Sequence, residues 1–447
     1  MALIELDLYS PVEPAPGPPP GRHRPLSVAV LTILLVVLTA GSVPPRSALL
    51  RRTGLATIPG PQGTYSLVGG QLYTFHPDRT RLVTTAWSLD PLRRLWDRIT
   101  PIPNQRRDGT VPELGWWIAE AAPGDVLLQA EESATVLDAR TGRVRWSSPV
   151  PVNPVDGGRI GLVHEQEFRP GTRYDQSIGA SGPLFFGNDG LFHTEPPLHT
   201  TLHAVDLRTG RPLWNVTLAG SVIARAAPSE PDAVLVVGSD RLAVLSARTG
   251  AVVRTRPVSF SAVRDGANFV DDLVLVRRGG PGTEAEITAY SARTLAPVWR
   301  LSMGYYIVPA FCSDLLCSSA TSGMVVLDPA NGRPRWRSEV GASLIGRGDV
   351  VVQLGDAATR PIAVRDAATG AVRVDLRGWT WYADSRPEDP LVLGRVSGGQ
   401  MIFGVLLPGS RSVQLLGVSS NPVANCASDD RFLVCRVLGG VEAWSYL

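Results

Sequence analysis

Apolar and polar positions alternate along most of this chain, and one short pattern of this kind recurs. An apolar run ends in Asp or Ser, a turn follows, and a second run begins. The copies are VLDARTGRVRW (136–146), AVDLRTGRPLW (204–214), VLSARTGAVVR (244–254), AYSARTLAPVW (289–299), VLDPANGRPRW (326–336) and AVRDAATGAVRV (363–374). The basic spacing is about 40 residues, with one long insertion, which fits four short strands per unit as in propeller blades.

Each position of the repeat has a physical role. The carboxylate at the end of the first run can cap the turn by accepting backbone N–H bonds, as at Asp138, Asp206, Asp328 and Asp366. Glycine supplies the positive φ that a tight turn needs, as at Gly142, Gly210, Gly332 and Gly370. A Trp eight residues after the first position can pack on the neighbouring blade and donate its indole N–H to a backbone carbonyl. These rings are Trp146, Trp214, Trp299 and Trp336, and we interpret them as structural.

Weaker copies flank the clear ones. LYTFHPDRTRLV (72–83) puts His76 at the Asp position, and MIFGVLLPGSRSVQLL (401–416) puts Pro408-Gly409 in the turn. The final segment, 431–447, supplies two strands and stops before an outermost one. A strand near Leu55 or Tyr65 can fill that gap, which would close the ring and remove exposed sheet edges. The pattern predicts an all-β propeller over 55–447 with about eight four-stranded blades, seven or nine being possible.

The motif D-x-x-T-G with a downstream Trp resembles the quinoprotein-like (pyrroloquinoline-quinone-like repeat) β-propeller family. That family includes bacterial outer-membrane assembly factors and the catalytic domains of quinone-dependent alcohol dehydrogenases. The resemblance covers roughly residues 55–447. It implies the propeller fold, but it does not imply quinone binding, because many relatives keep the repeat and bind no cofactor.

The N-terminal region has a different character. Residues 1–25 are Pro-rich, and we expect a disordered cytoplasmic tail. Residues 26–43 (LSVAVLTILLVVLTAGSV) are uncharged and long enough to span a bilayer as one transmembrane helix. A cleaved signal peptide is the alternative, but the preceding segment is long and the small-residue site is weak. Residues 44–54 would then be a linker.

The four cysteines form two local pairs, which predict the disulfides Cys312–Cys317 and Cys426–Cys435. Disulfides persist in oxidising compartments, so this pairing favours an extracytoplasmic propeller held at the cell membrane by a single span. Four buried free thiols in a cytoplasmic domain are the alternative interpretation.

Composition excludes several classes of function. The formal net charge is +2, which argues against nucleic-acid binding. Every basic residue is Arg, so mechanisms that depend on lysine are excluded. The resemblance implies that a quinone dehydrogenase would carry adjacent cysteines, a calcium site and a catalytic Asp. The sequence has no Cys-Cys pair, so we predict neither a cofactor nor catalytic residues.

The insertion between the copies at 138 and 206 contains the weak metal candidates His193, His199 and His203, together with Asp189 and Glu195. Histidine and carboxylate are common ligands of zinc. Pro196-Pro197 argue against the helix that an H-x3-H pair would prefer, so we favour a polar surface loop. Long loops on a repeat scaffold are nevertheless good candidates for recognition.

We therefore expect a membrane-anchored extracytoplasmic scaffold that binds a protein or another cell-envelope ligand and is not an enzyme. A quinone-dependent oxidoreductase and a single-pass envelope sensor are the alternatives.

Overall fold

The computed structural model describes residues 49–446 except for short intervals, and the gaps lie at 59–62, 79–80, 102–116, 131–132, 176, 178–183, 188–190, 228–229, 260–265, 271, 279–284, 304–308, 313–314, 321–322, 340–341 and 356–359. These residues belong to one compact unit, Ala48–Leu447. The predicted tail and membrane span (1–25 and 26–43) lie outside the described residues. Among the described residues, the structure contains no helix with the length and apolarity needed to span a bilayer.

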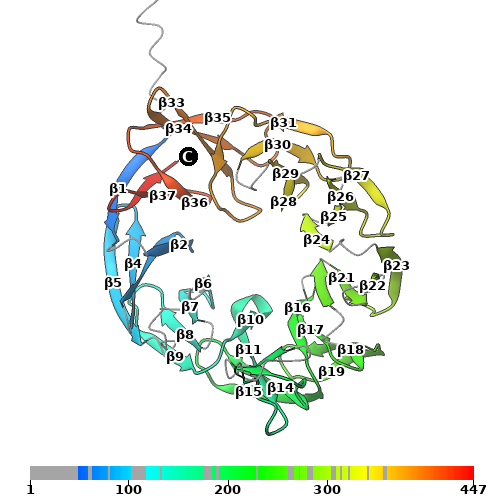
Figure 1. The fold of residues 1–447 in the computed structure, drawn as a ribbon. Helices are drawn as coiled ribbons and strands as arrows, with labels where there is room; N and C mark the ends of the chain where they lie inside the picture. Colours follow the sequence, from blue (N-terminus) through cyan, green and yellow to red (C-terminus); the bar gives the residue numbers. More distant parts are fainter. Residues whose placement is uncertain are drawn as a thin grey trace, which may run out of the picture. The chain divides into compact units, whose positions relative to one another are not determined.

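Nine four-stranded antiparallel sheets follow one another around a ring, so the described residues form a β-propeller with nine blades (Figure 1). Blade 1 holds β2 (Thr64–Val68), β3 (Gln71–Asp78), β4 (Arg81–Leu89) and β5 (Leu92–Pro101). Blade 2 holds β6 (Trp117–Glu120), β7 (Asp125–Ala130), β8 (Ser133–Asp138) and β9 (Val144–Ser148). Blade 3 holds β10 (Asn153–Val155), β11 (Ile160–Glu167), β14 (His199–Asp206) and β15 (Pro212–Ala219), with the short 3-10 helix η1 (Asp156–Gly158) after β10.

The next three blades repeat the order. Blade 4 holds β16 (Ile223–Ala227), β17 (Glu230–Val237), β18 (Arg241–Ser246) and β19 (Val252–Pro257). Blade 5 holds β20 (Gly266–Val270), β21 (Leu273–Arg278), β22 (Ala285–Ser291) and β23 (Pro297–Met303). Blade 6 holds β24 (Pro309–Cys312), β25 (Leu315–Ala320), β26 (Gly323–Leu327) and β27 (Pro334–Arg337).

Three further blades complete the ring. Blade 7 holds β28 (Ser343–Arg347), β29 (Val350–Leu354), β30 (Pro361–Asp366) and β31 (Val372–Asp375). Blade 8 holds β32 (Trp381–Tyr382), β33 (Leu391–Ser397), β34 (Gln400–Leu406) and β35 (Gln414–Ser419). Blade 9 holds β36 (Ala424–Ser428), β37 (Phe432–Val437), β38 (Gly440–Ser445) and the N-terminal strand β1 (Arg51–Thr57).

Blade 9 combines the two ends of the propeller. The C-terminal chain gives the three inner strands, and β1 pairs antiparallel with β38 as the outermost strand, with Leu55 opposite Glu442. The closure predicted near Leu55 is thus confirmed. Tyr65 instead lies on β2, the innermost strand of blade 1. The first strand begins at Arg51, four residues before the expected boundary.

The propeller class is confirmed, and the blade count is one higher than the expected eight. All three weak copies belong to complete blades: blades 1, 8 and 9. The assignment of His76 to the Asp position was wrong, because 72–83 spans the hairpin between β3 and β4. The turn that corresponds to the repeat in blade 1 lies at Asp90, between β4 and β5. Any hairpin shows an apolar run, a polar turn and a second run, so this pattern alone does not identify the outer turn.

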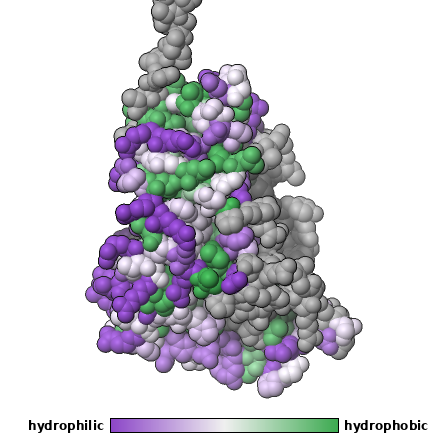
Figure 2. Space-filling model, turned by 90° about the vertical axis from the view of Figure 1, so that its left-hand side faces the viewer, coloured by the Kyte–Doolittle hydropathy of each residue, from purple (hydrophilic) through white to green (hydrophobic). Residues whose placement is uncertain are grey.

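Stacking of the blades explains the composition of the strands. The two middle strands of a blade are covered on both faces, so they read as continuous apolar runs, as in Ala233–Val237 and Leu242–Leu245. Outer strands alternate, as β15 does. Exposed apolar residues such as Leu55 and Ile99 therefore remain on β1 and β5. Figure 2 shows this side of the propeller, where hydrophobic and hydrophilic patches are interleaved.

Candidate functional site: the turn face

One face of the propeller is built from short turns, and we call it the turn face. Except in blades 8 and 9, it carries the turn between the first and second strands and the turn between the third and fourth, such as Gly348-Asp349 and Asp366–Gly370 in blade 7. The second of these is the sequence repeat. In these blades both types of turn are short.

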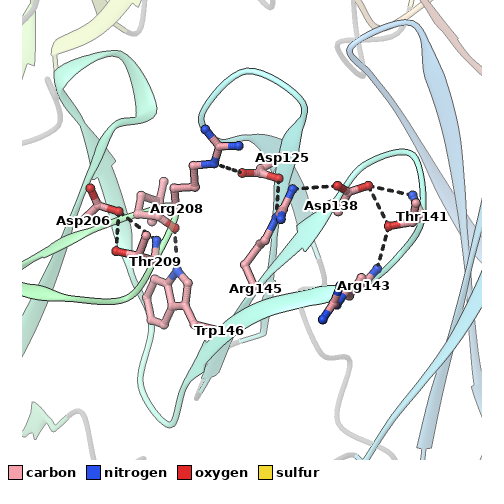
Figure 3. A network of polar contacts seen from close by, with 10 residues as sticks. Asp125, Asp138, Thr141, Arg143, Arg145, Trp146, Asp206, Arg208 and Thr209 are labelled. Carbon is pink, nitrogen blue, oxygen red and sulfur yellow. Dashed lines mark hydrogen bonds and ion pairs between the residues drawn. The ribbon is translucent and has the colours of Figure 1, made fainter.

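The repeat turns are fixed by their carboxylates (Figure 3). Asp138 Oδ1 accepts hydrogen bonds from the backbone N–H of Thr141 at 2.9 Å and from its hydroxyl at 2.8 Å. The Thr141 hydroxyl bond is the largest influence that lowers the pKa of Asp138. Asp206 and Thr209 repeat the arrangement in blade 3. The carboxylates therefore serve the turns, as the sequence indicated, and the bonded N–H lies two or three residues on.

Arginines join these turns into a network that sequence reasoning did not find. Arg145 bonds Asp138 at 2.7 Å and the buried Asp125 at 3.1 Å, so it ties the two turns of blade 2 together. Arg208, on the repeat turn of blade 3, lies 3.7 Å from Asp125. Arg373 repeats the first arrangement in blade 7, with Asp349 and Asp366. The sequence did contain a signal for this network. An Arg lies seven residues after the Asp of the repeat at positions 145, 335 and 373.

A Trp ring connects successive blades at five junctions. Each indole N–H donates to a backbone carbonyl of the next repeat turn, at distances of 2.5–3.0 Å. Each ring also covers the turn glycine so closely that a Cβ there would lie 2.5–2.8 Å from it. The rings are Trp96, Trp146, Trp214, Trp299 and Trp336. The packing predicted for the repeat tryptophans is confirmed, and Trp96 was missed because the copy in blade 1 had been misplaced.

Blade 8 sends a segment across the turn face toward the centre of the ring. This crossing segment, 383–390, joins β32 to β33 and projects toward the centre of the ring (Figure 1). Asp384 forms a parallel bridge with Ala427 of β36, so the segment covers the inner edge of blade 9. Beyond it, Arg386 reaches Glu120 of blade 2 at 3.3 Å.

Arg347 holds the crossing segment from blade 7. Its guanidinium donates to the Ser385 hydroxyl at 3.0 Å and to the carbonyls of Arg386 and Asp389 at 2.8 and 2.5 Å. Burial lowers the pKa of this group, although arginine stays charged at any physiological pH. The crossing segment is therefore a fixed part of the face, contacted by blades 2, 7 and 9.

A pocket of about 500 Å³ lies between the crossing segment and the inner strands of blades 1 and 2. Its walls include the backbone of β2 and five carboxylates: Glu120, Asp384, Asp389, Asp429 and Asp430. Burial raises the pKa of Asp389 and of Asp429, and neighbouring carboxylates add to the rise in both. Ionisation of these two carboxyl groups is therefore less favourable in the folded protein than in water.

Asp429, with a raised pKa, and Asp366, with a lowered one, should affect the pH dependence of stability in opposite directions. Because the pKa of Asp429 is raised on folding, its ionisation opposes folding at pH 7, and the opposition fades as the pH falls through that raised value. Asp429→Asn should therefore raise the midpoint of thermal unfolding at pH 7 and have less effect in acid. Asn can still accept the N–H bonds from Arg431 and Phe432.

Asp366 supplies the control of opposite sign. The hydrogen bond from Arg373 lowers its pKa to about 2, so its stabilising effect is present above about pH 4 and is lost as the pH falls toward 2. Asp366→Asn should lower the unfolding midpoint at pH 7. The same sign for both variants at pH 7 would contradict these assignments.

A second pocket, of about 610 Å³, lies between blades 7 and 8 on the same face. Aliphatic side chains of the middle strands form its walls, among them Val352, Val364, Leu391 and Leu406. Arg373, Arg411 and Asp349 stand at its rim, and Asp389 lies on the walls of both pockets. The crossing segment thus separates two hollows on one surface.

The structure gives each of the three histidines that were weak metal candidates a different partner. His193 is buried and stacks on Phe168 with ring centroids 3.7 Å apart. His199 lies 2.8 Å from Glu167, and His203 lies 2.7 Å from Glu165, across the strand pair β11–β14. Asp189 lies outside the described residues. Within the part of the chain that the structure describes, no cluster of three or more His, Cys, Asp or Glu is placed to hold a metal ion.

The insertion itself forms a small hairpin, β12 (Phe185–Phe186) with β13 (Phe192–His193). A pocket of about 410 Å³ beside it is lined by Glu167, Phe168, His193 and His199, among others. It lies at the start of β14 and the end of β11, on the face opposite the turn face. The polar loop favoured from the sequence thus has a defined structure, with His193 as part of its core.

The cysteines of blade 9 form the predicted bond. Cys426 and Cys435 lie opposite each other on β36 and β37, with Cα atoms 4.1 Å apart, and their sulfurs are joined. Cys317 is also disulfide-bonded. The side chain of its predicted partner, Cys312, lies outside the described residues.

Replacing Cys426 and Cys435 together by Ser should destabilise the propeller by about 2–3 kcal/mol, because the bond closes a short loop in the unfolded chain. Urea unfolding with and without reductant measures this. Reductant should destabilise the wild-type protein by at least as much as the double substitution does. An unchanged midpoint in the double variant would show that the bond does not stabilise blade 9.

The geometry defines a class of protein: a nine-bladed propeller with Asp-capped repeat turns and Trp rings between blades. The family model described as "Outer membrane protein assembly factor BamB" matches residues 199–375 and 283–421, about half of the chain. The chain belongs to the quinoprotein-like, PQQ-like repeat propeller family, as its motifs indicated.

Similar solved structures have low sequence identity. BamB from Moraxella catarrhalis is 17% identical, with 74% of this chain and 96% of that chain covered and a TM-score of 0.38. The Dos1 propeller is 12% identical, with 89% and 95% covered and a TM-score of 0.40. A eukaryotic initiation factor is 8% identical, with 80% and 90% covered and a TM-score of 0.44. No curated protein matches the chain.

Proposed function

We propose that this chain is a single-pass, membrane-anchored scaffold whose propeller lies outside the cytoplasm and binds a protein of the cell envelope on its turn face. The observation that carries the proposal is the pair of hollows, about 610 and 500 Å³, on either side of the fixed crossing segment. A binding surface needs concavity, rigidity and a mixture of apolar walls and polar rim. The turn face between blades 7 and 2 combines all three.

Two further features support the location and the role. The disulfide of blade 9 suits an oxidising compartment, and residues 26–43 have the length and apolarity of a membrane span. The matched family model is named for an outer-membrane assembly factor, which agrees with a protein partner. The role we propose is binding without catalysis.

Two photo-crosslinking variants of the full chain, made in the cells that produce it, test whether the turn face binds the partner protein. p-Benzoylphenylalanine replaces Ser410 on the turn face in one variant. In the other it replaces Val396, a 63% exposed residue of the same blade near the opposite face. We expect a discrete adduct from position 410 and none from 396. Adducts of equal yield from both positions, or none from 410, would contradict the proposal.

A further inference from the structure

The junction between blades 7 and 8 lacks, at the repeat position, the Trp that docks at five other junctions. In blade 6 the ring is Trp336, opposite Val326 on the neighbouring strand. The corresponding residue of blade 7 is Val374, opposite Val364. Val is much smaller than an indole, and Val364 lines the 610 Å³ pocket. Val374 itself is buried in the core between the two blades, where Trp379 also packs, and the pocket lies beside this core.

The turn glycines give an independent sign that this place is open. A Cβ on Gly370, under Trp336, would lie 2.6 Å from the ring. Gly409, in the corresponding turn of blade 8, also has a positive φ, +75°, yet a Cβ there would meet nothing within 4 Å. The positive φ has been kept in a longer turn with different hydrogen bonds, but no ring covers it.

Another junction without Trp shows what a filled alternative looks like. Blade 4 carries Arg254 at the Trp position, and it pairs with Glu230 at 2.8 Å. The next turn carries Leu295 in place of glycine, with φ at +57°. Leu295 is 1% exposed and packs into the core between the blades. The space there is filled from the turn side. Between blades 7 and 8, Trp379 packs against Gly404 but leaves the space beside Gly409 open.

We propose that this open slot between blades 7 and 8 receives an aromatic side chain from the protein that the scaffold binds. The walls combine the aliphatic side chains of Val352, Val364, Leu391 and Leu406 with charged groups. At the rim, Arg373 and Arg411 can stack on a π-face. Arg373 is also paired with Asp349 and Asp366.

The occupant is a protein side chain because the slot opens directly onto the turn face. Aromatic residues presented in this way are the typical anchors of protein interfaces. A free small molecule is usually enclosed over most of its surface, and here the turn around Gly409 leaves one side open. This inference rests on the proposed function, and it specifies the partner chemistry of that face.

The test uses the full-length protein and N-acetyltryptophanamide as the probe, followed by saturation-transfer NMR. We expect a dissociation constant of roughly 0.1–1 mM for a ligand of this size, and no binding of N-acetylalaninamide. A short hairpin peptide with Trp at its turn should bind at least as tightly as the amide. Binding of the amide alone, with no binding of the peptide, would assign the slot to a small molecule and overturn the proposal.

Two substitutions fill the slot from opposite sides. Val374→Trp restores the ring seen at five other junctions, and Gly409→Leu copies the arrangement of Leu295. Both should weaken probe binding at least tenfold, and Val374→Trp should also raise the thermal midpoint. Val298→Trp adds a Trp at an exposed position of an outer strand and should leave binding unchanged.

Unchanged probe binding in both filled variants, or no binding to the wild-type protein, would overturn the proposal. The crosslinking pair at Ser410 and Val396 reports on the turn face without reference to the slot. A crosslink at 410 together with an empty slot would leave the scaffold function intact and refute the aromatic anchor alone.

Discussion

Gly370→Ala will destabilise the propeller by about 2–5 kcal/mol, whereas Gly409→Ala will cost only about 1–2 kcal/mol. Both glycines have left-handed backbones, with φ of +73° and +75°, so both variants carry the same backbone penalty. Only at Gly370 does the new methyl group meet a Trp ring, at 2.6 Å. Overpacking of that kind adds about 1–3 kcal/mol.

The comparison isolates the docked ring, because the two variants differ in surroundings and not in chemistry. Urea unfolding followed by Trp fluorescence and by circular dichroism measures both. Equal destabilisation by the two substitutions would mean that Trp336 can move aside at no cost, or that the slot at Gly409 is filled. Either result would contradict the difference between a covered Gly370 and an uncovered Gly409.

Ala56→Asp will destabilise the ring by about 3–5 kcal/mol, while Leu55→Asp on the same strand will change stability by about 1 kcal/mol or less. Ala56 is fully buried in the core shared by β1, blade 1 and blade 9. A carboxylate there would be desolvated without a partner. Leu55 is 46% exposed, so the same side chain remains in water.

This pair tests closure by the N-terminal strand. Thermal unfolding of the two variants is sufficient, since they share a substitution and differ only in the face of β1 on which it lies. If Leu55→Asp were as damaging as Ala56→Asp, the register of β1 against β38 would be wrong. If neither variant mattered, β1 would not be part of the ring.

The sequence predicted those parts of the fold that depend on local chemistry. A repeated Asp, Thr, Gly and Trp at constant spacing is a sufficient signal, because each residue meets a requirement of one turn or one junction. The closing strand was also predictable, since two C-terminal strands without an outer partner leave a sheet edge exposed. The Cys426–Cys435 bond followed from the short spacing in one hairpin.

The rest depends on contacts between distant segments. Blade 1 was assigned to the wrong hairpin because its repeat turn carries Asp90-Pro91 in place of Asp-x-x-Thr-Gly. The crossing segment 383–390 has no periodic pattern, and its contacts with Glu120 and Arg347 join blades far apart in the chain. No local signal reports such pairs.

The open slot could be predicted from the sequence only in part. The absence of Trp at position 374 was visible in the repeat alignment, since AVRDAATGAVRV ends in Val where four other copies carry Trp. Whether a missing ring leaves a pocket depends on the facing turn. Leu295 fills the space after blade 4, and Gly409 does not fill it after blade 7. That difference required the structure.

The most direct test of the account is the side of the membrane on which the propeller lies. Val396→Cys in the full-length chain places a thiol at an exposed site distant from the turn face. Cells with an intact cytoplasmic membrane are treated with a membrane-impermeant maleimide before and after lysis. We predict full labelling before lysis, together with retention of the protein in the membrane fraction. Labelling only after lysis would place the propeller in the cytoplasm and contradict an extracytoplasmic scaffold.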